Sequence, residues 1–244
     1  MLPSRVKSHP GQLAPGSLPQ GWRIYAIGDI HGCAGQLAAL HAQIAEDAAT
    51  RPAQRTILIH LGDYVDRGPD SAAVLDRLLG PAPVPGAEVV LLLGNHEVML
   101  LDACEPHPHP GALPFWLDNG GAATLASYGI DPDDPGALAA VPPLHLDLLR
   151  HCPLSFEAGD YLFVHAGVRP GVPPDRQDPF DLVWIREPFL SYEGDLPQVV
   201  VHGHTPTEVP AIRPHRIGID TGACFGGPLT CVVLEGQRLR FLTA

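Results

Sequence analysis

Basic charge is scarce in this sequence. Of its 244 residues, 15 are Lys or Arg and 27 are Asp or Glu, which gives a formal charge of −12, and Lys7 is the only lysine. Binding along a nucleic-acid backbone requires a broad basic surface. The composition therefore argues against a nucleic-acid partner, but it is compatible with a small phosphorylated ligand that is drawn to a few local arginines.

Long apolar runs and cysteine pairs are missing as well. No segment approaches the ~18 to 20 apolar residues of a membrane-spanning helix, and residues 1–21 are polar and rich in proline and glycine, unlike a secretory signal. The five cysteines form no CxxC pair, which favours reduced thiols over disulfides. We expect a cytoplasmic protein without a membrane partner, in which a mobile arm (1–21) precedes a single domain (22–244).

What the sequence does contain is an alternation of strand and helix patterns. Apolar segments predict strands at 23–28, 56–61 and 88–93, with helices at 36–49 and 71–79 between them. This order is typical of parallel strands joined by right-handed crossovers. The second half is strand-rich, so we expect an α/β domain with two sheets. Further predicted helices are 98–104, 115–128 and 144–150, and further predicted strands are 161–164, 199–201, 217–219, 230–234 and 239–242.

Polar residues follow five of these strands at the point where each strand ends. A lone Asp after a strand is more often a helix cap, and a lone His is more often a surface group. Five coincidences of the same kind favour a site, because open α/β sheets bind ligands at the carboxyl ends of their strands. The residues concerned are Asp29 and His31; Asp63, Asp66 and Arg67; Asn95, His96 and Glu97; His165; and His202 and His204.

The ligand types in this set predict a metal centre. Carboxylate, imidazole and amide groups without thiolate suit Mn²⁺, Fe or Zn²⁺. Six ligands from this set would exceed what one four-coordinate zinc ion takes, whereas two metals that share a bridging carboxylate would use six. We therefore expect two divalent metal ions, and Mn²⁺ is the preferred choice.

Several motifs resemble those of one enzyme family. GDIHG (28–32), GDYVDRG (62–68) and GNHE (94–97), followed by a VHAG and a GHT histidine, resemble the phosphoprotein phosphatase family of calcineurin-like metallophosphoesterases. WIRE (184–187) and IDTGACFGG (219–227) also resemble its bacterial and bacteriophage serine/threonine protein phosphatases. The resemblance implies a four-layer α/β/β/α sandwich and hydrolysis of a phosphomonoester by direct attack of metal-bound hydroxide, on a phosphorylated protein or a small phosphorylated substrate.

The resemblance also implies roles for individual residues. Asp29 and His31 would bind the first metal, Asp63 would bridge, and Asn95, His165 and His204 would hold the second. His96 would be the general acid that protonates the leaving oxygen, with Asp66 orienting its imidazole. Arg67 and Arg186 would clamp the phosphate. The simpler alternative is that Arg67 forms an ion pair with Asp66 or Asp70, and that Arg186 forms one with Glu187.

The segment VVVHGHT contains two histidines, His202 and His204, that could bind metal. Side chains two apart on a strand face the same way, so the strand alone would allow both His202 and His204 to bind metal. In related metallophosphoesterases a GHxH pattern supplies two ligands, but here Pro206 stands in place of the second histidine. We therefore assign His204 to the metal and exclude His202.

Three rival functions remain to be weighed. A dinucleoside tetraphosphatase shares the fold and the metals, but those enzymes resemble GDLVARG and GNHD, whereas this chain has Asp66 and Glu97 at the differing positions. A non-catalytic phosphate-binding module would be expected to lack a ligand or the general acid, and a metal-stabilised structural protein needs neither Arg67 nor His96. The motifs thus favour a protein-phosphatase-like enzyme.

Overall fold

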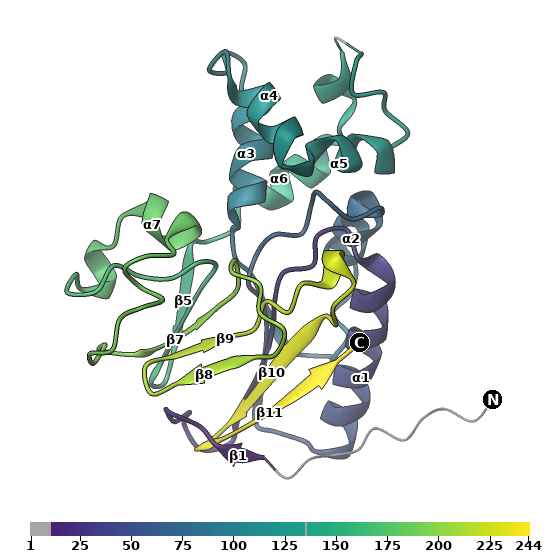
Figure 1. Ribbon diagram of the computed structural model, residues 1–244. Coiled ribbons are helices and arrows are strands. Elements are labelled where there is room, and N and C mark those ends of the chain that lie inside the picture. Colours follow the sequence, from purple (N-terminus) through teal and green to yellow (C-terminus); the bar gives the residue numbers. More distant parts are fainter. Residues whose placement is uncertain (1–10, 135) are drawn as a thin grey trace.

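The computed structural model describes residues 11–134 and 136–244, and its centre is a pair of mixed β-sheets (Figure 1). The six-stranded sheet has the order β1-β11-β10-β2-β3-β4, and the five-stranded sheet has the order β5-β6-β7-β9-β8. Helices cover the outer face of each sheet. The predicted four-layer α/β/β/α architecture is confirmed.

The first sheet is built around the parallel strands that the sequence predicts. β2 (Trp22–Ile27), β3 (Arg55–His60) and β4 (Glu88–Leu91) run parallel. On the far side of β2 the hairpin of β10 (Thr230–Glu235) and β11 (Arg238–Thr243) adds antiparallel strands. Helices α1 (Ala34–Thr50) and α2 (Ser71–Leu79) pack on the outer face of this sheet through Leu37, Leu40, Val74 and Leu75.

The second sheet combines parallel and antiparallel pairs. β6 (Tyr161–Val164), β7 (Val199–His202) and β9 (Arg216–Gly218) are parallel, and β5 (Ser155–Ala158) and β8 (Ala211–Arg213) are its antiparallel edges. Apolar side chains such as Ile57 and Phe163 fill the space between the two sheets. Helix α7 (Pro179–Trp184), which the sequence did not predict, packs on the outer face with Leu182 and Ile185.

A group of helices stands at the end of the sheets where the parallel strands finish (Figure 1). The predicted helix 98–104 is α3 (Asn95–Ala103), which begins three residues earlier. The predicted helix 115–128 is wrong as a continuous unit, because Gly120 adopts φ 106° inside it. Arg67 lies against Gly120, where an added Cβ would come within 2.9 Å of the Arg67 backbone nitrogen. The segment is therefore divided into α4 (Ala112–Trp116), a π-helical turn (Leu117–Gly121) and α5 (Ala122–Ser127), and α6 (Pro143–Arg150) follows.

Part of the predicted N-terminal arm belongs to the folded domain. β1 (Gln12–Leu13) pairs with β11, Leu18 is buried, and the hydroxyl of Tyr161 donates to the carbonyl of Gly16. The prediction of a mobile arm is thus wrong for residues 11–21, while residues 1–10 lie outside the described residues.

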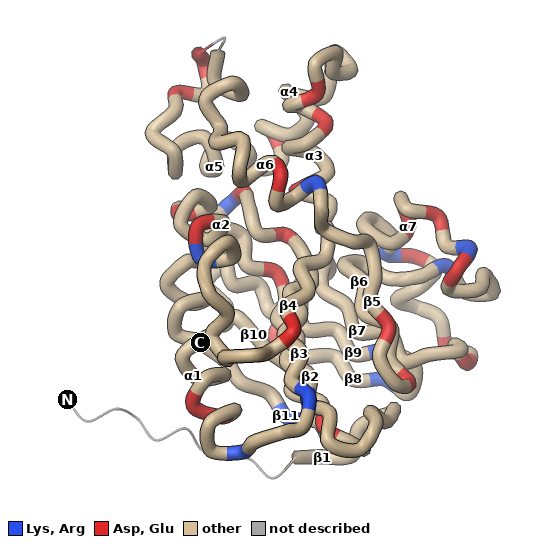
Figure 2. Tube along the Cα trace, turned by 180° about the vertical axis from the view of Figure 1, so that it is seen from behind, with Lys and Arg blue, Asp and Glu red and all other residues tan. Residues whose placement is uncertain are grey.

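Lys and Arg positions are scattered along the trace, several of them around α7 (Figure 2). Among residues 11–134 and 136–244, no helix is both long and apolar enough to cross a membrane.

Candidate active site

The predicted site residues meet at the carboxyl ends of β2, β3, β4, β6 and β7, and their backbone is unusual. The non-glycine residues with positive φ in the described chain are all among the predicted site residues. Left-handed backbone is unfavourable for side chains with a Cβ, and it persists where the surrounding structure enforces it, often at functional sites. These residues are His31 (43°), Asp63 (52°), Asp66 (71°), Arg67 (67°) and His204 (63°).

Asp63 lies at the middle of the site. Its Oδ2 is 3.3 Å from Nε2 of His31, and its Oδ1 is 3.4 Å from Nε2 of His165. The side chain is almost fully buried. Burial alone would raise its pKa, but His165 and His96 outweigh that effect and hold the pKa of Asp63 well below its usual value. The carboxylate is therefore ionised and lies between two imidazoles, as a ligand shared by two cations requires.

The second group of predicted ligands gathers around an amide. Oδ1 of Asn95 is 2.9 Å from Nε2 of His165 and 3.0 Å from Nδ1 of His204. Donor atoms of Asp63, His165 and His204 all lie within 4.8 Å of one another, close enough to hold one ion. Burial, and after it His165, lower the pKa of His204 to about 3, so its imidazole is neutral near pH 7. Neutral imidazole is the form that binds metal.

Backbone carbonyls orient two of the histidines. Nδ1 of His31 lies 2.8 Å from the carbonyl oxygen of Val65, and Nδ1 of His165 lies 2.9 Å from that of Leu61. A histidine that donates from Nδ1 to a carbonyl presents a lone pair at Nε2, which is how metal-binding histidines are commonly positioned. The other group of donor atoms close enough to hold one ion consists of His31, Asp63 and His96, and Asp29 belongs to neither group. The donor types and the free Nε2 atoms of His31 and His165 fit divalent ions in two groups that share Asp63.

Asp29 is held next to a residue that the sequence analysis did not single out. The backbone N–H of His204 donates to Asp29 at 2.9 Å, and Asp220 makes a side-chain contact with Asp29. Both carboxylates are buried. Burial, then Asp220 and Asp63, raise the pKa of Asp29 well above its usual value. Burial also raises the pKa of Asp220. Two buried carboxylates in contact either share a proton or need a nearby cation.

His96 and Asp66 form a buried pair. Nδ1 of His96 is 2.7 Å from Oδ2 of Asp66. Asp66 also accepts hydrogen bonds from the indole N–H of Trp116 at 3.0 Å and from the hydroxyl of Thr124 at 2.7 Å. Nε2 of His96 is buried, has no hydrogen-bond partner among the described residues, and is 4.0 Å from Oδ2 of Asp63. The free nitrogen of His96 therefore lies beside Asp63. His96, Trp116 and Thr124 together hold the carboxylate of Asp66 in place.

Glu97 shapes the loop that carries Asp63. Its two carboxylate oxygens accept from the backbone N–H groups of Asp63 (2.7 Å), Tyr64 (2.7 Å), Val65 (3.2 Å) and Gly94 (3.0 Å). One buried side chain thus satisfies four backbone donors, which explains why a glutamate follows Asn95 and His96.

The two predicted phosphate-binding arginines lie at the exposed side of the site. Nη1 of Arg67 is 2.8 Å from Nε2 of His31, in place of the ion pair with Asp66 or Asp70 considered from the sequence. Arg186 is exposed, and its charge contributes to the lowered pKa of His204 after burial and His165. Glu187 accepts from the backbone of Ser191 at 3.3 Å. The guanidinium group of Arg67 therefore contacts an expected metal ligand, while Arg186 acts on His204 through its charge.

Histidines outside the predicted set have other surroundings. Nδ1 of His202 is 3.1 Å from the carbonyl of Gly203, and its Nε2 is 3.5 Å from Nη1 of Arg216. His60 is buried in the core, where its Nε2 is 3.0 Å from Nε2 of His41. His107 and His109 lie in the loop between α3 and α4. Neither His202 nor His60 belongs to the groups able to hold an ion in the described chain.

Comparison with known proteins places the chain in a family. The profile described as calcineurin-like phosphoesterase matches residues 23–231. A symmetrical bis(5'-nucleosyl)-tetraphosphatase of Acidovorax sp. is 34% identical over 72% of this chain and 51% of that protein, so the chain spans about half the length of the first curated relatives it matches. Serine/threonine-protein phosphatase 1 of Salmonella typhimurium is 29% identical over 88% of this chain and 94% of that protein. A crystal structure described as a candidate diadenosine tetraphosphatase superposes with a TM-score of 0.64 at 23% identity, covering 94% of this chain and 98% of that one.

Proposed function

Because the chain belongs to the calcineurin-like phosphoesterase family, we propose that it is a dinuclear-metal hydrolase of phosphomonoesters, of the serine/threonine protein phosphatase type. The observation that carries the proposal is the buried pair of His96 and Asp66 beside Asp63, with Nε2 of His96 free. A binding or structural metal site has no need of an oriented imidazole whose second nitrogen is unpaired.

The proposed ligands divide into two sets around Asp63. Asp29 and His31 would hold the first metal, Asn95, His165 and His204 would hold the second, and Asp63 would serve both. When bound, the metals, for which we propose Mn²⁺, supply Lewis-acid activation of the phosphate and of the attacking water. A bound first metal would also favour the ionised forms of Asp29 and of Asp220, which is in contact with it.

His96 is proposed as the general acid. Asp66 holds Nδ1 of His96 and stabilises the protonated imidazole, while Trp116 and Thr124 hold Asp66 in place. Nε2 then gives its proton to the oxygen of the leaving alcohol. Arg67 and Arg186 offer planar guanidinium donors to the other phosphate oxygens.

The motifs and the comparisons support different substrates. Asp66 and Glu97 follow the protein-phosphatase motifs and have clear structural roles here, and the Salmonella protein phosphatase aligns over 94% of its length. The alternative is hydrolysis of a dinucleoside polyphosphate, which the identity to the Acidovorax tetraphosphatase favours.

The substrate question has a direct test. With Mn²⁺ present, kcat/KM is measured on a phosphoserine peptide, a phosphotyrosine peptide and diadenosine tetraphosphate. We expect the highest value for the phosphoserine peptide, because the oriented acid assists the departure of a poor leaving group. A higher kcat/KM for diadenosine tetraphosphate would favour the alternative function over the proposed one.

The two histidines of VVVHGHT give a second prediction. His204→Ala removes a proposed ligand and should lose one metal per chain together with nearly all activity. His202→Ala is the matched control, because His202 is also buried but faces Gly203 and Arg216. It should keep both metals and most activity. Elemental analysis of both variants checks this, and loss of a metal from His202→Ala would show that the ligand is misassigned by two residues.

A further inference from the structure

Three aromatic side chains form a continuous cluster beside the proposed metal centre. The ring centroid of Trp184, at the end of α7, is 6.1 Å from that of His204. Phe180 stacks on Trp184 at 6.0 Å with an interplanar angle of 21°, and Phe115 of α4 lies 6.3 Å from Trp184. We name Phe115, Phe180 and Trp184 the aromatic cluster. It connects two helices that are distant in sequence and adjoins a proposed ligand of the second metal.

The outer part of the cluster is open to water. Phe180 is 64% exposed and Phe115 is 53% exposed, while Trp184 is half-buried. When a ligand covers exposed apolar surface next to a site, the removal of that surface from water favours binding. A flat ring is well suited to cover it, since aromatic pairs add a specific attraction to the burial of their area.

We propose that the aromatic cluster binds an aromatic side chain of a phosphorylated peptide, two residues from the phosphorylated residue. The inference rests on the proposed phosphatase function and names a feature of its substrate. An extended peptide rises ~3.3 Å per residue, so side chains two apart lie about 6.6 Å from each other on one face. The rings of His204, Trp184 and Phe180 follow one another at 6.1 and 6.0 Å, a similar spacing.

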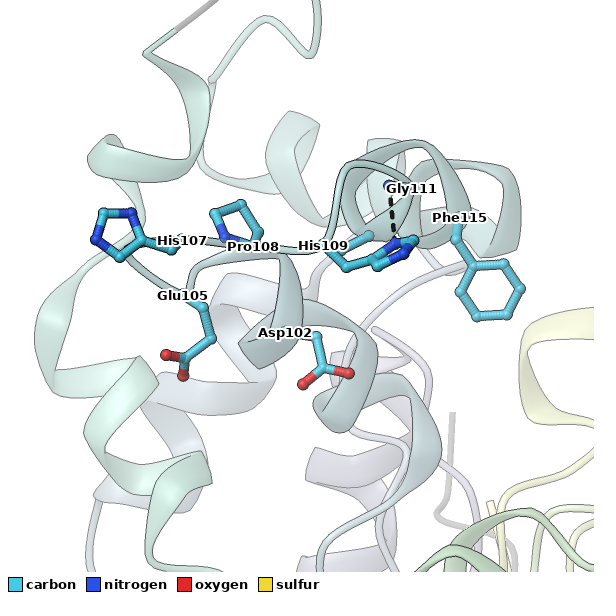
Figure 3. Close-up of a pocket in the computed structure, with 8 residues that line it drawn as sticks. Asp102, Glu105, His107, Pro108, His109, Gly111 and Phe115 are labelled. Carbon is cyan, nitrogen blue, oxygen red and sulfur yellow. Dashed lines mark hydrogen bonds between the residues drawn. The ribbon is translucent and has the colours of Figure 1, made fainter.

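Charge near the cluster favours a peptide over a polyphosphate. Beyond Phe115 lies a pocket of about 560 Å³ between α3 and α4, in which Asp102 and Glu105 lie below the loop of His107 and His109 (Figure 3). The carboxylates of Asp102 and Glu105 disfavour further phosphate groups at this pocket, which also contains His107 and His109. The residues that flank a phosphorylated side chain in a peptide can be neutral or basic and meet no such repulsion. The aromatic cluster and the pocket together therefore fit an extended peptide.

The test compares peptides that differ at one position. Phosphoserine peptides carrying Phe or Ala two residues before or after the phosphoserine are incubated with the enzyme and Mn²⁺, and their hydrolysis is measured. The wild-type enzyme should prefer the better Phe peptide by about threefold to tenfold in kcat/KM, mainly through KM. Phe180→Ala should bring this ratio close to one. Leu144→Ala is the matched control, because Leu144 is 63% exposed on α6 and lies outside the cluster, and it should keep the wild-type ratio.

Three results would overturn the inference. The Phe/Ala ratio could be the same in the wild-type enzyme and in Phe180→Ala. Phe180→Ala could leave the peptide ratio unchanged but raise KM for diadenosine tetraphosphate, which would assign the cluster to a nucleobase. A wild-type enzyme that hydrolyses aryl phosphates but no phosphopeptide would overturn both this inference and the proposed function. The first result would leave phosphopeptide hydrolysis intact. Failure of this inference can therefore be distinguished from failure of the proposed function.

Discussion

Asp63→Asn is expected to lose both metals and to lower kcat/KM by about 10³-fold or more, because the metals supply several kcal/mol of transition-state stabilisation. The carboxylate lies 3.3 Å from Nε2 of His31 and 3.4 Å from Nε2 of His165, so its charge acts on both proposed metals. Asparagine tolerates the left-handed backbone that this position adopts at φ 52°. The fold should therefore survive, and the loss should report on charge alone.

Single-site variants provide the comparison for Asp63. His31→Ala and Asn95→Ala each remove a ligand of one metal only, so each should retain more metal than Asp63→Asn. The measurement is metal per chain by elemental analysis after gel filtration. Two metals per chain in Asp63→Asn would show that Asp63 is not the bridging ligand.

His96→Asn should lower kcat by roughly 10² to 10⁴, the range for loss of a general acid. The metals should stay bound, because His96 directs Nδ1 to Asp66 at 2.7 Å and its Nε2 is 4.0 Å from the Asp63 carboxylate. The loss should be largest on phosphoserine peptides, whose alkoxide leaving group needs a proton.

Leaving-group dependence separates this role from a structural one. An aryl phosphate departs as a stable phenolate, so His96→Asn should lose much less activity on it than on a phosphoserine peptide. Unchanged metal content and a native circular dichroism spectrum would exclude misfolding. An equal loss on both substrates would contradict the assignment of His96 as the acid.

Much of the first sheet could be predicted, because each of its parallel strands is an apolar segment that is followed by a glycine and then a polar residue. The apolar segments before Asp29 and Asp63 are parallel strands in the structure, and the residues after them lie at one edge of the sheet. Helix α3 begins at Asn95, whereas the apolar pattern predicts a start only at Val98, after the polar GNHE motif. Glu97 accepts from the backbone N–H of Gly94 at 3.0 Å, and the helix begins there.

Other parts of the site depend on contacts that no local pattern shows. Trp116 and Thr124 bind Asp66 across 50 and 58 residues of sequence. Asp220 lies in a quoted motif, but its contact with Asp29 arises only when the two sheets pack together. Helix α7 is short and begins at Pro179, in a stretch where the sequence analysis predicts neither a helix nor a strand. The side chain of Asp178 accepts from the N–H of Phe180 at 2.9 Å and caps this helix.

The most direct test of the dinuclear centre is a metal titration that follows binding and catalysis together. The protein is stripped with a chelator, its metal content is verified by elemental analysis, and Mn²⁺ is added back while bound metal and phosphatase activity are measured on the same samples. We expect no activity in the stripped protein, two Mn²⁺ bound per chain at saturation, and full activity only when both sites are filled. Full activity in the verified metal-free protein, or at one bound metal per chain, would contradict the account.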